Sequence, residues 1–303
     1  MKTPEKVSSI SALHQFLGLQ RPSHPLISVF NFDDVKLQSE TILQAVTTDF
    51  YAIALKKDCA GGKCRYGQQY YDFDEGIMYF MAPHQVMQFE DILLNGVKGF
   101  VLVVHPDFLQ GYSLAAGIKD YGYFSYASNE ALHLSEKEEN SVMHIIENIS
   151  RETDANIDAF TQDLLVSNIE LLLKYCDRFY NRQFLTRKKV NNDLLTKLEA
   201  LLDDYFRSGK LAEKGIPTVQ WVADALHLSP NYLSDMLRVQ TGQTTQQHIQ
   251  NRVIEKAKEL LSLTGMSVSE IAYELGFEHP QSFHRLFKNR TSVSPLEFRA
   301  SFN

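Results

Sequence analysis

The stretch VSEIAYELGFEHPQSFHRLFKNRTS, residues 268–292, decides the fold of this chain because an earlier stretch repeats it. VQWVADALHLSPNYLSDMLRVQTG, residues 219–242, superposes on it with an offset of 49 residues up to Leu228/Phe277 and of 50 residues from Pro230/Pro280 onward. Size and polarity are kept at the other matched positions, which are Val219/Val268, Val222/Ile271, Ala223/Ala272, Leu226/Leu275, Leu233/Phe283, Met236/Leu286, Leu237/Phe287 and Arg238/Lys288. Such a repeat indicates two copies of one supersecondary unit.

Each copy has the pattern of a short helix, a tight connection and a second helix. Pro230 and Pro280 fall near the first turn of the second helix, where a missing N–H has no intrahelical partner to lose, and Ser229 is a good N-cap. The paired alanines fit the close approach of two steeply crossing helices, which predicts a helix-turn-helix in each copy. A helical stripe between the copies would hold them at a fixed separation; it comprises Ile249, Val253, Ala257, Leu260 and Leu261.

Residues 195–300 resemble the C-terminal domain of the AraC/XylS family of bacterial transcription regulators. The resemblance rests on SPNYLSDMLRVQTG, NRVIEKAKELL and IAYELGFEHPQSFHRLFKNRTSVSPLEFR; in the last of these, the family signature falls on Ile271, Ala272, Gly276, Phe277, Phe283, Phe287, Lys288, Ser294, Pro295 and Arg299. The chain departs from the family pattern at His227 and Ser292, where glycine is common, and at Asp235 on the first predicted recognition helix. Asp235 weakens the case for base reading by the first unit.

The resemblance implies a double-stranded DNA partner, with two recognition helices reading successive major grooves about 34 Å apart. With the apolar positions set aside, the candidate base-contacting residues are Asn231, Ser234, Asp235 and Arg238 on the first helix, and Gln281, Ser282, His284, Arg285 and Lys288 on the second. Their side chains suit direct readout of bases, and the alternative for each is a solvated surface residue. Outside the recognition turns, the candidates for phosphate contacts or ion pairs within the domain are Arg252, Arg290 and Arg299.

The first part of the chain has the pattern of a β domain. Short runs rich in aromatic and β-branched residues, punctuated by Gly, Asn and Asp, predict strands in LISVFNF, DFYAIALKK, RYGQQYYDF, IMYFMAP and GFVLVV. Strands without intervening helices favour an antiparallel barrel or sandwich, and YGQQYYDFDEGIMYFMAPHQV resembles the cupin-like sensor of the same family. We therefore expect an α+β multidomain chain: a cupin-like β-barrel with flanking helices, then an all-α domain with two helix-turn-helix units.

The expected boundaries follow from changes in the pattern. We expect residues 1–181 to form the effector-sensing and dimerisation domain, with the barrel over about 25–125 and helices over about 135–181. The linker is expected at residues 182–192, which include four basic residues. The DNA-binding domain is expected over residues 193–303. A heptad seam in the last helix before the linker indicates either packing on the barrel or a homodimer contact. The seam consists of Leu165, Ile169, Leu172, Cys176 and Phe179.

Composition sets further limits on a chain of 303 residues. Its net charge of −7 lies wholly in residues 1–210, because 211–303 carry nine basic and nine acidic residues. A sensor joined to a nucleic-acid reader has this distribution, and a fluctuation of surface charge explains it equally well. With no apolar run near the ~20 residues of a membrane span and no signal peptide, we expect a cytoplasmic protein without a membrane partner.

Metal and cofactor chemistry is not expected. Four residues separate Cys59 from Cys64, which fits neither a C-x-x-C motif nor a zinc site. His84 and His105 stand alone, each next to a proline, and no His-x-His pair occurs anywhere in the chain. GxxxxGK, GxSxG and HExxH are absent as well, so the chain is expected not to be an enzyme.

The resemblance implies a transcription regulator that responds to a small-molecule effector, and family membership favours activation. It also implies that the protein forms a homodimer and contacts RNA polymerase. Candidate effector contacts are Tyr51, Tyr66, Tyr70, Tyr79 and His84, with Gln85 beside them; aromatic residues on strands also serve as plain core. Two alternatives remain open at this point. The barrel only dimerises and binds no ligand, or the helical repeat is a protein-interaction module in a chain that does not bind DNA, such as a cupin-type enzyme.

Overall fold

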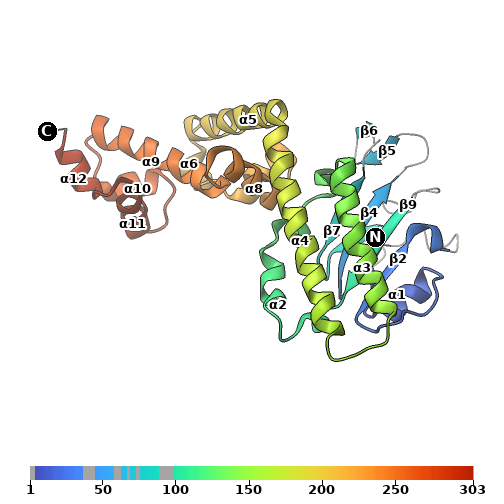
Figure 1. Cartoon of the computed structure of the whole chain (residues 1–303). Coiled ribbons are helices and arrows are strands. Elements are labelled where there is room, and N and C mark those ends of the chain that lie inside the picture. Colours follow the sequence, from blue (N-terminus) through green and yellow to red (C-terminus); the bar gives the residue numbers. More distant parts are fainter. Residues whose placement is uncertain are drawn as a thin grey trace. The chain divides into compact units, whose positions relative to one another are not determined.

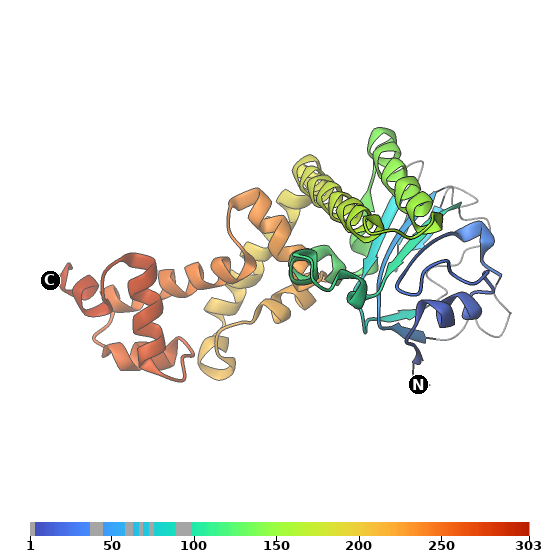
Figure 2. The same ribbon diagram turned by 60° about the horizontal axis from the view of Figure 1, so that its bottom comes forward.

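The computed structural model describes residues 4–36, 45–57, 63–66, 69–72, 76–88 and 98–302, with the backbone alone at 63–66, 69–72, 87–88, 188–190 and 212. The chain divides into two compact units, Met1–Gln183 and Phe184–Asn303. Figures 1 and 2 show strands and flanking helices in the first unit and helices throughout the second. The expected α+β composition and the all-helical second part are therefore seen.

A five-stranded antiparallel sheet forms the centre of unit 1. Its order is β10-β7-β4-β9-β2, and its strands are β10 (Leu132–His133), β7 (Ile77–Met81), β4 (Tyr51–Lys57), β9 (Lys98–Val104) and β2 (Ile27–Asn31). Four of these correspond to predicted strand segments. Strand β4 lies in the middle, with Ala54 opposite Tyr79 on one side and opposite Val101 on the other. This register decides which side chains share a face.

A second, smaller sheet has the order β1-β3-β8, in which β1 (Glu5–Val7) is parallel to β3 (Ala45–Thr48) and β8 (Val86–Gln88) is antiparallel to it. A separate hairpin joins β5 (Lys63–Tyr66) to β6 (Gln69–Asp72). No strand ladder links the two sheets in the part of the chain that is described, so the expected closed barrel is not seen there. The sequence pattern also missed β1, β3 and helix α1 (Ile10–Phe16).

The two faces of the large sheet are covered by different elements. Helices α3 (Glu136–Asp154) and α4 (Thr161–Thr186) lie along one face, and α1 with the N-terminal segment lies on the other (Figures 1 and 2). On the α1 side, a core cluster joins Ile10 and Leu13 to Val46 of the small sheet and to Val101 and Val103 of β9. Short 3₁₀ segments, η1 (Phe32–Asp34), η3 (Pro106–Leu109), η4 (Ile118–Asp120), η5 (Gly122–Ser125) and η6 (Ser128–Glu130), and α2 (Leu114–Gly117) connect these elements.

The heptad seam of α4 packs inside unit 1. Its members are 0–5% exposed: Leu165, Ile169, Leu172, Cys176 and Phe179. The Cys176 Sγ lies 3.9 Å from the Sδ of Met78 on β7, and burial raises the pKa of the thiol. The prediction of a dimer contact through these five residues is wrong, because the sheet already covers them; the alternative of a helix packed on the strands describes them.

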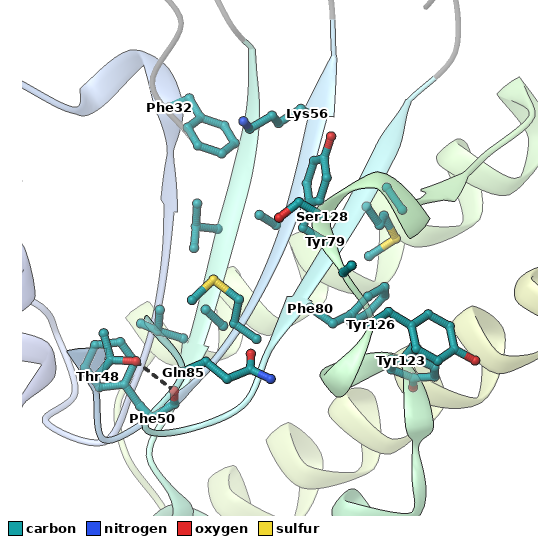
Figure 3. A pocket seen from close by; sticks show the side chains of 18 of the residues that line it. Phe32, Thr48, Phe50, Lys56, Tyr79, Phe80, Gln85, Tyr123, Tyr126 and Ser128 are labelled. Carbon is teal, nitrogen blue, oxygen red and sulfur yellow. Dashed lines mark hydrogen bonds between the residues drawn. The ribbon is translucent and has the colours of Figure 1, made fainter. Parts of the chain in front are cut away.

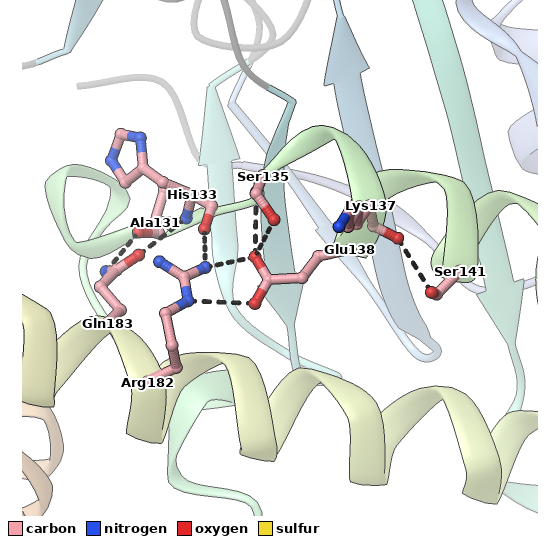
Figure 4. Close-up of polar contacts among 8 residues, drawn as sticks. All are labelled: Ala131, His133, Ser135, Lys137, Glu138, Ser141, Arg182 and Gln183. Atoms are coloured by element: carbon pink, nitrogen blue, oxygen red, sulfur yellow. Dashed lines mark hydrogen bonds and ion pairs between the residues drawn. The ribbon is translucent and has the colours of Figure 1, made fainter.

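The predicted linker at 182–192 is helical. Arg182 donates to both carboxylate oxygens of Glu138, at 3.0 and 2.6 Å, and to the carbonyl of His133 at 2.6 Å. Gln183 bonds to the backbone of Ala131 and of His133, so both residues tie α4 to β10 (Figure 4). Lys and Arg have good helix propensity, and a basic run is therefore no evidence of a break.

Between α4 and α5 (Lys188–Arg207) only Arg187 lies outside a helix. The Nδ2 of the buried Asn191 donates to the carbonyl of Phe184 at 2.6 Å, which satisfies a carbonyl at the end of α4. Unit 2 continues with α6 (Lys210–Lys214), α7 (Val219–Leu226), α8 (Pro230–Thr241), α9 (Thr245–Leu263), α10 (Val268–Glu274), α11 (Pro280–Thr291) and α12 (Pro295–Ala300).

Candidate functional site

The first helix-turn-helix consists of α7 and α8. Thr218 caps α7 by accepting the N–H of Trp221 at 3.1 Å, and Ser229 caps α8 by accepting the N–H of Tyr232 at 3.3 Å. Ala223 and Leu233 are fully buried where the two helices meet. Local capping therefore starts both helices where the sequence places them, and the alanine allows their close approach.

The second helix-turn-helix consists of α10 and α11. Ser267 and Glu270 form a capping box at the start of α10, and Pro280 occupies the first turn of α11. Phe283 and Phe287 are fully buried, with ring centroids 5.7 Å apart, beside the fully buried Ala272. The long helix α9 joins the two helix-turn-helix copies, and four residues of its predicted stripe are at most 2% exposed: Ile249, Val253, Ala257 and Leu261.

Two of the three departures from the family pattern, His227 and Ser292, lie at left-handed backbone positions. His227 ends α7 with φ 58°, and the equivalent Gly276 has φ 78°; Gly242 ends α8 with φ 75°, and the equivalent Ser292 ends α11 with φ 65°. A Cβ on Gly276 would lie 2.7 Å from the Cα of Gly215. Glycine adopts this conformation freely, so each copy has one relaxed and one strained turn.

The surface of α11 carries the largest set of candidate base contacts. The five predicted residues are exposed on the side away from Phe283 and Phe287: Gln281, Ser282, His284, Arg285 and Lys288. Three of them can carry or gain positive charge, and none is acidic. This helix presents hydrogen-bond donors and acceptors together with positive charge, which is the chemistry that base edges and phosphates require.

The surface of α8 is more constrained. The Oγ of Ser234 lies 3.0 Å from the Oγ1 of the buried Thr245, which holds the Ser234 hydroxyl against α9. Asp235 accepts a hydrogen bond from the Nη1 of Arg238 at 2.8 Å. Asn231 is exposed in the first turn. All four predicted residues thus lie on α8, but the side chains of three of them, Ser234, Asp235 and Arg238, bond to other side chains of the protein.

The three candidate phosphate contacts have protein partners. Arg252 pairs with Asp203 at 3.1 Å, and Arg290 donates to the Oε1 of Gln250 at 2.5 Å. Arg299 donates through Nε to the carbonyl of Leu261 at 3.2 Å, and its Nη2 is buried. Arg299 therefore anchors α12 to the end of α9, whereas Arg252 and Arg290 are accessible enough to exchange their partners for a phosphate.

Unit 1 contains a cavity of about 450 Å³ on the α1 side of its large sheet (Figure 3). Small side chains open it: Ala52 and Ala54 project from β4 toward it, opposite Val103 and Val101 of β9. Most of the lining is apolar or aromatic and includes Leu13, Leu17, Phe30, Phe32, Phe50, Met81 and Tyr123. Burial raises the pKa of the Tyr123 hydroxyl, which donates to the carbonyl of Leu173 at 3.0 Å.

The predicted effector contacts meet this cavity only in part. Tyr79 and the neighbouring Gln85 line it. Tyr51 does not, because it alternates with Ala52 on β4 and packs edge-on against Phe124 at 5.1 Å on the other face. The ring of His84 is largely exposed and pairs with Asp49 at 3.1 Å. Tyr66 and Tyr70 lie on β5 and β6, and their side chains fall outside the described part of the structure.

Sequence reasoning missed the most unusual residue of the lining, Lys56. It is 3% exposed although it carries an ammonium group. A signal was present along β4, because Ala52 and Ala54 alternate with the bulky Tyr51, Ile53 and Leu55, and Lys56 falls on the same face as the two alanines. The alternation does not show which face borders a cavity, and the lysine was therefore overlooked.

Among the described residues, no group of three or more His, Cys, Asp or Glu side chains is arranged to hold a metal ion. None of the helices in the described ranges combines the length and apolar character that crossing a membrane requires.

Comparisons with known proteins place the chain in a family. A family model described as a helix-turn-helix domain matches residues 222–301. The transcriptional activator RhaS of Salmonella dublin is 30% identical over 260 residues, which is 83% of this chain and 85% of that protein. RhaS of Enterobacter sp. (strain 638) is 38% identical over 121 residues, 39% of this chain and 40% of that protein.

Among solved structures, the C-terminal domain of the two-component response regulator yesN from Fusobacterium nucleatum is 29% identical. It covers 33% of this chain and 96% of that one, with a TM-score of 0.29. The RhaS likeness extends over both units and the family model over both helix-turn-helix copies. The chain therefore belongs to the AraC/XylS family of sequence-specific DNA-binding transcription regulators, which are not enzymes.

Proposed function

We propose that each copy of this protein reads two successive major-groove segments, one with α8 and one with α11. The observation that carries this proposal is the equivalence of the two helices, each of which buries an apolar face against α9 and its partner helix and exposes a polar face. A rigid connection through the buried stripe of α9 supports a fixed spacing between them.

The two helices contribute unequally in this proposal. On α11, Gln281, His284 and Arg285 supply the main base contacts, and Ser282 and Lys288 add to them. On α8, Asn231 is accessible, whereas Arg238 must leave Asp235 before it contacts a guanine. An exposed pair of this kind is worth only about 0.3–0.5 kcal/mol, so DNA can displace it. Arg252 and Arg290 contact phosphates.

Unit 1 is, in this proposal, a cupin-like sensor whose cavity takes a small-molecule effector. Support comes from the cavity itself, since a volume of about 450 Å³ and a mainly apolar lining are those of a small-molecule site. By analogy with the RhaS proteins, which are named activators, the bound state activates transcription through RNA polymerase. The domain boundary falls near the change of unit between Gln183 and Phe184.

A homodimer contact also belongs to this proposal, at a different place from the predicted seam. Within unit 1, the connection between α3 and α4 and the outer side of α4 expose four large apolar side chains, 45–71% accessible: Ile157, Phe160, Leu164 and Leu171. Phe160, Leu164 and Leu171 recur at helical spacing. Covering them with a second copy would bury surface that water otherwise contacts.

The decisive experiment is in vitro selection from random duplex DNA with the full-length protein at physiological salt, followed by sequencing. Enrichment of two sequence blocks about one helical turn apart is the expected result. A single enriched block would contradict tandem reading. No enrichment, with or without a metabolite extract, would contradict DNA recognition by this chain alone and favour a protein-interaction role.

A further inference from the structure

We infer that the ligand of the unit 1 cavity is an organic acid with an apolar body, whose carboxylate binds the ammonium group of Lys56. This inference rests on the proposed sensor function and specifies the chemical class of the effector. Figure 3 shows Lys56 near Phe32 and Tyr79, with Thr48, Phe50 and Gln85 at the opposite end of the cavity in this view. The cavity thus has the ammonium group of Lys56 toward one end and a lining that is mainly apolar or aromatic elsewhere.

The position of Lys56 favours binding of an anion. Its Nζ lies 6.0 Å from the centre of the Phe32 ring and 5.3 Å from that of Tyr79. These ring faces orient the ammonium, which has three N–H donors and can add a bond to a ligand while keeping contacts within the protein. Lys56 is 3% exposed, and the attraction between a buried ammonium and a carboxylate is less screened than between the same groups at the surface.

Two polar side chains of the lining, Gln85 and Thr48, make hydrogen bonds to the protein backbone. Gln85 accepts from the N–H of Ala82 at 3.0 Å and donates to the carbonyl of Phe124 at 2.6 Å. The Thr48 hydroxyl donates to the carbonyl of Phe50 at 3.2 Å. Because most of the lining is apolar or aromatic, a sugar or another polyol would place several hydroxyl groups against side chains that offer no hydrogen bond, and each unpaired buried hydroxyl weakens binding. An apolar body with one anionic group avoids this cost.

Glu130 is a buried carboxylic acid in the lining, and it closes a local turn. Its Oε2 accepts the N–H of Ala127 at 2.6 Å, which closes the turn of η6. A carboxylate bound to a backbone donor in this way stabilises the lining rather than attracting a cation from solution. A zwitterionic ligand, with its ammonium group bound to Glu130 and its carboxylate bound to Lys56, is therefore one alternative that the experiment must test.

The test measures binding to the full-length protein by calorimetry, with two acids of different shape, 2-naphthoate and decanoate, each beside its neutral methyl ester. We expect the acids to bind about 10- to 100-fold more tightly than the esters. Lys56→Met should remove this preference and Lys56→Arg should retain it. Lys57→Met is the matched control, because Lys57 follows on the same strand and pairs instead with Glu139 on α3.

Three outcomes would overturn the inference. Equal affinity for acids and esters in the native protein would show an apolar site without a cationic anchor. Tight binding of glucose or of L-phenylalanine in preference to both acids would show a polyol or zwitterion site. Absence of binding by either acid at millimolar concentration would exclude this ligand class. Enrichment of DNA in the selection experiment is independent of all three, so the failure of this inference and the failure of DNA recognition are distinguishable.

Discussion

Arg285→Ala tests whether α11 reads bases. Arg285 is exposed on α11, and within the described chain no ion pair or hydrogen bond engages its guanidinium group. Its removal should therefore change the free energy of unfolding by less than about 0.5 kcal/mol. A bidentate contact between arginine and guanine contributes about 1–3 kcal/mol of discrimination, which corresponds to about 5- to 150-fold in affinity at one base pair. Arg285→Ala should therefore lose base discrimination at that one base pair and at no other.

The assay is competition binding with the selected duplex and with every single base-pair variant of it. For Arg285→Ala we expect one position to lose its preference while the others keep theirs. Arg290→Ala is the control, because a phosphate contact should weaken binding to all variants alike and make the salt dependence shallower by about one charge. The assignment is falsified if Arg285→Ala weakens every duplex by the same factor, since Arg285 would then contact only the backbone.

Three further predictions concern stability and reactivity. Ser292→Gly should raise the free energy of unfolding by about 0.5–1 kcal/mol in a urea titration, because it relieves a left-handed turn, and Gly242→Ser should lower it similarly. Hydrogen bonds from Ser294 lower the pKa of the Glu297 carboxyl, so the ionised carboxylate stabilises the fold above pH 4.5, and this stabilisation is lost as the pH falls through the folded-state pKa. In urea titrations at several pH values, Glu297→Gln should therefore reduce the pH dependence of the free energy of unfolding in this range. An unchanged pH dependence would contradict the prediction. Cys176 should resist alkylation until unit 1 unfolds, as followed by peptide mass spectrometry; labelling of the native protein would refute its burial.

The helix-turn-helix units were predictable because their signals are local. Capping residues, prolines and the spacing of apolar residues lie within a few positions of one another, and Ser229, Pro230 and Leu233 act where the sequence places them. The engagement of Ser234 with Thr245 and of Asp235 with Arg238 was not predictable in the same way. Ser234 and Thr245 belong to different helices, and the bond depends on the angle at which α8 meets α9.

The sensor was less predictable because its cavity is formed by residues far apart in the chain. Leu13, Phe32, Lys56 and Tyr123 come from four separate segments and meet only when the sheet and the N-terminal segment pack. Of the strand aromatic residues predicted as effector contacts, Tyr79 lines the cavity and Tyr51 does not. One position along a strand reverses the face of a side chain, and the sequence pattern does not say which face is lined by helices.

By itself the sequence determined the tandem repeat, the helical second unit and the family, because these depend on periodicity and on matches between nearby residues. Only the tertiary structure decided that the seam of α4 packs on the sheet, that residues 182–186 continue a helix, and that Lys56 borders a cavity. The physical reason is that an amphipathic pattern shows that a face is buried without showing what buries it. A partner subunit, a sheet and a ligand all favour the same apolar residues.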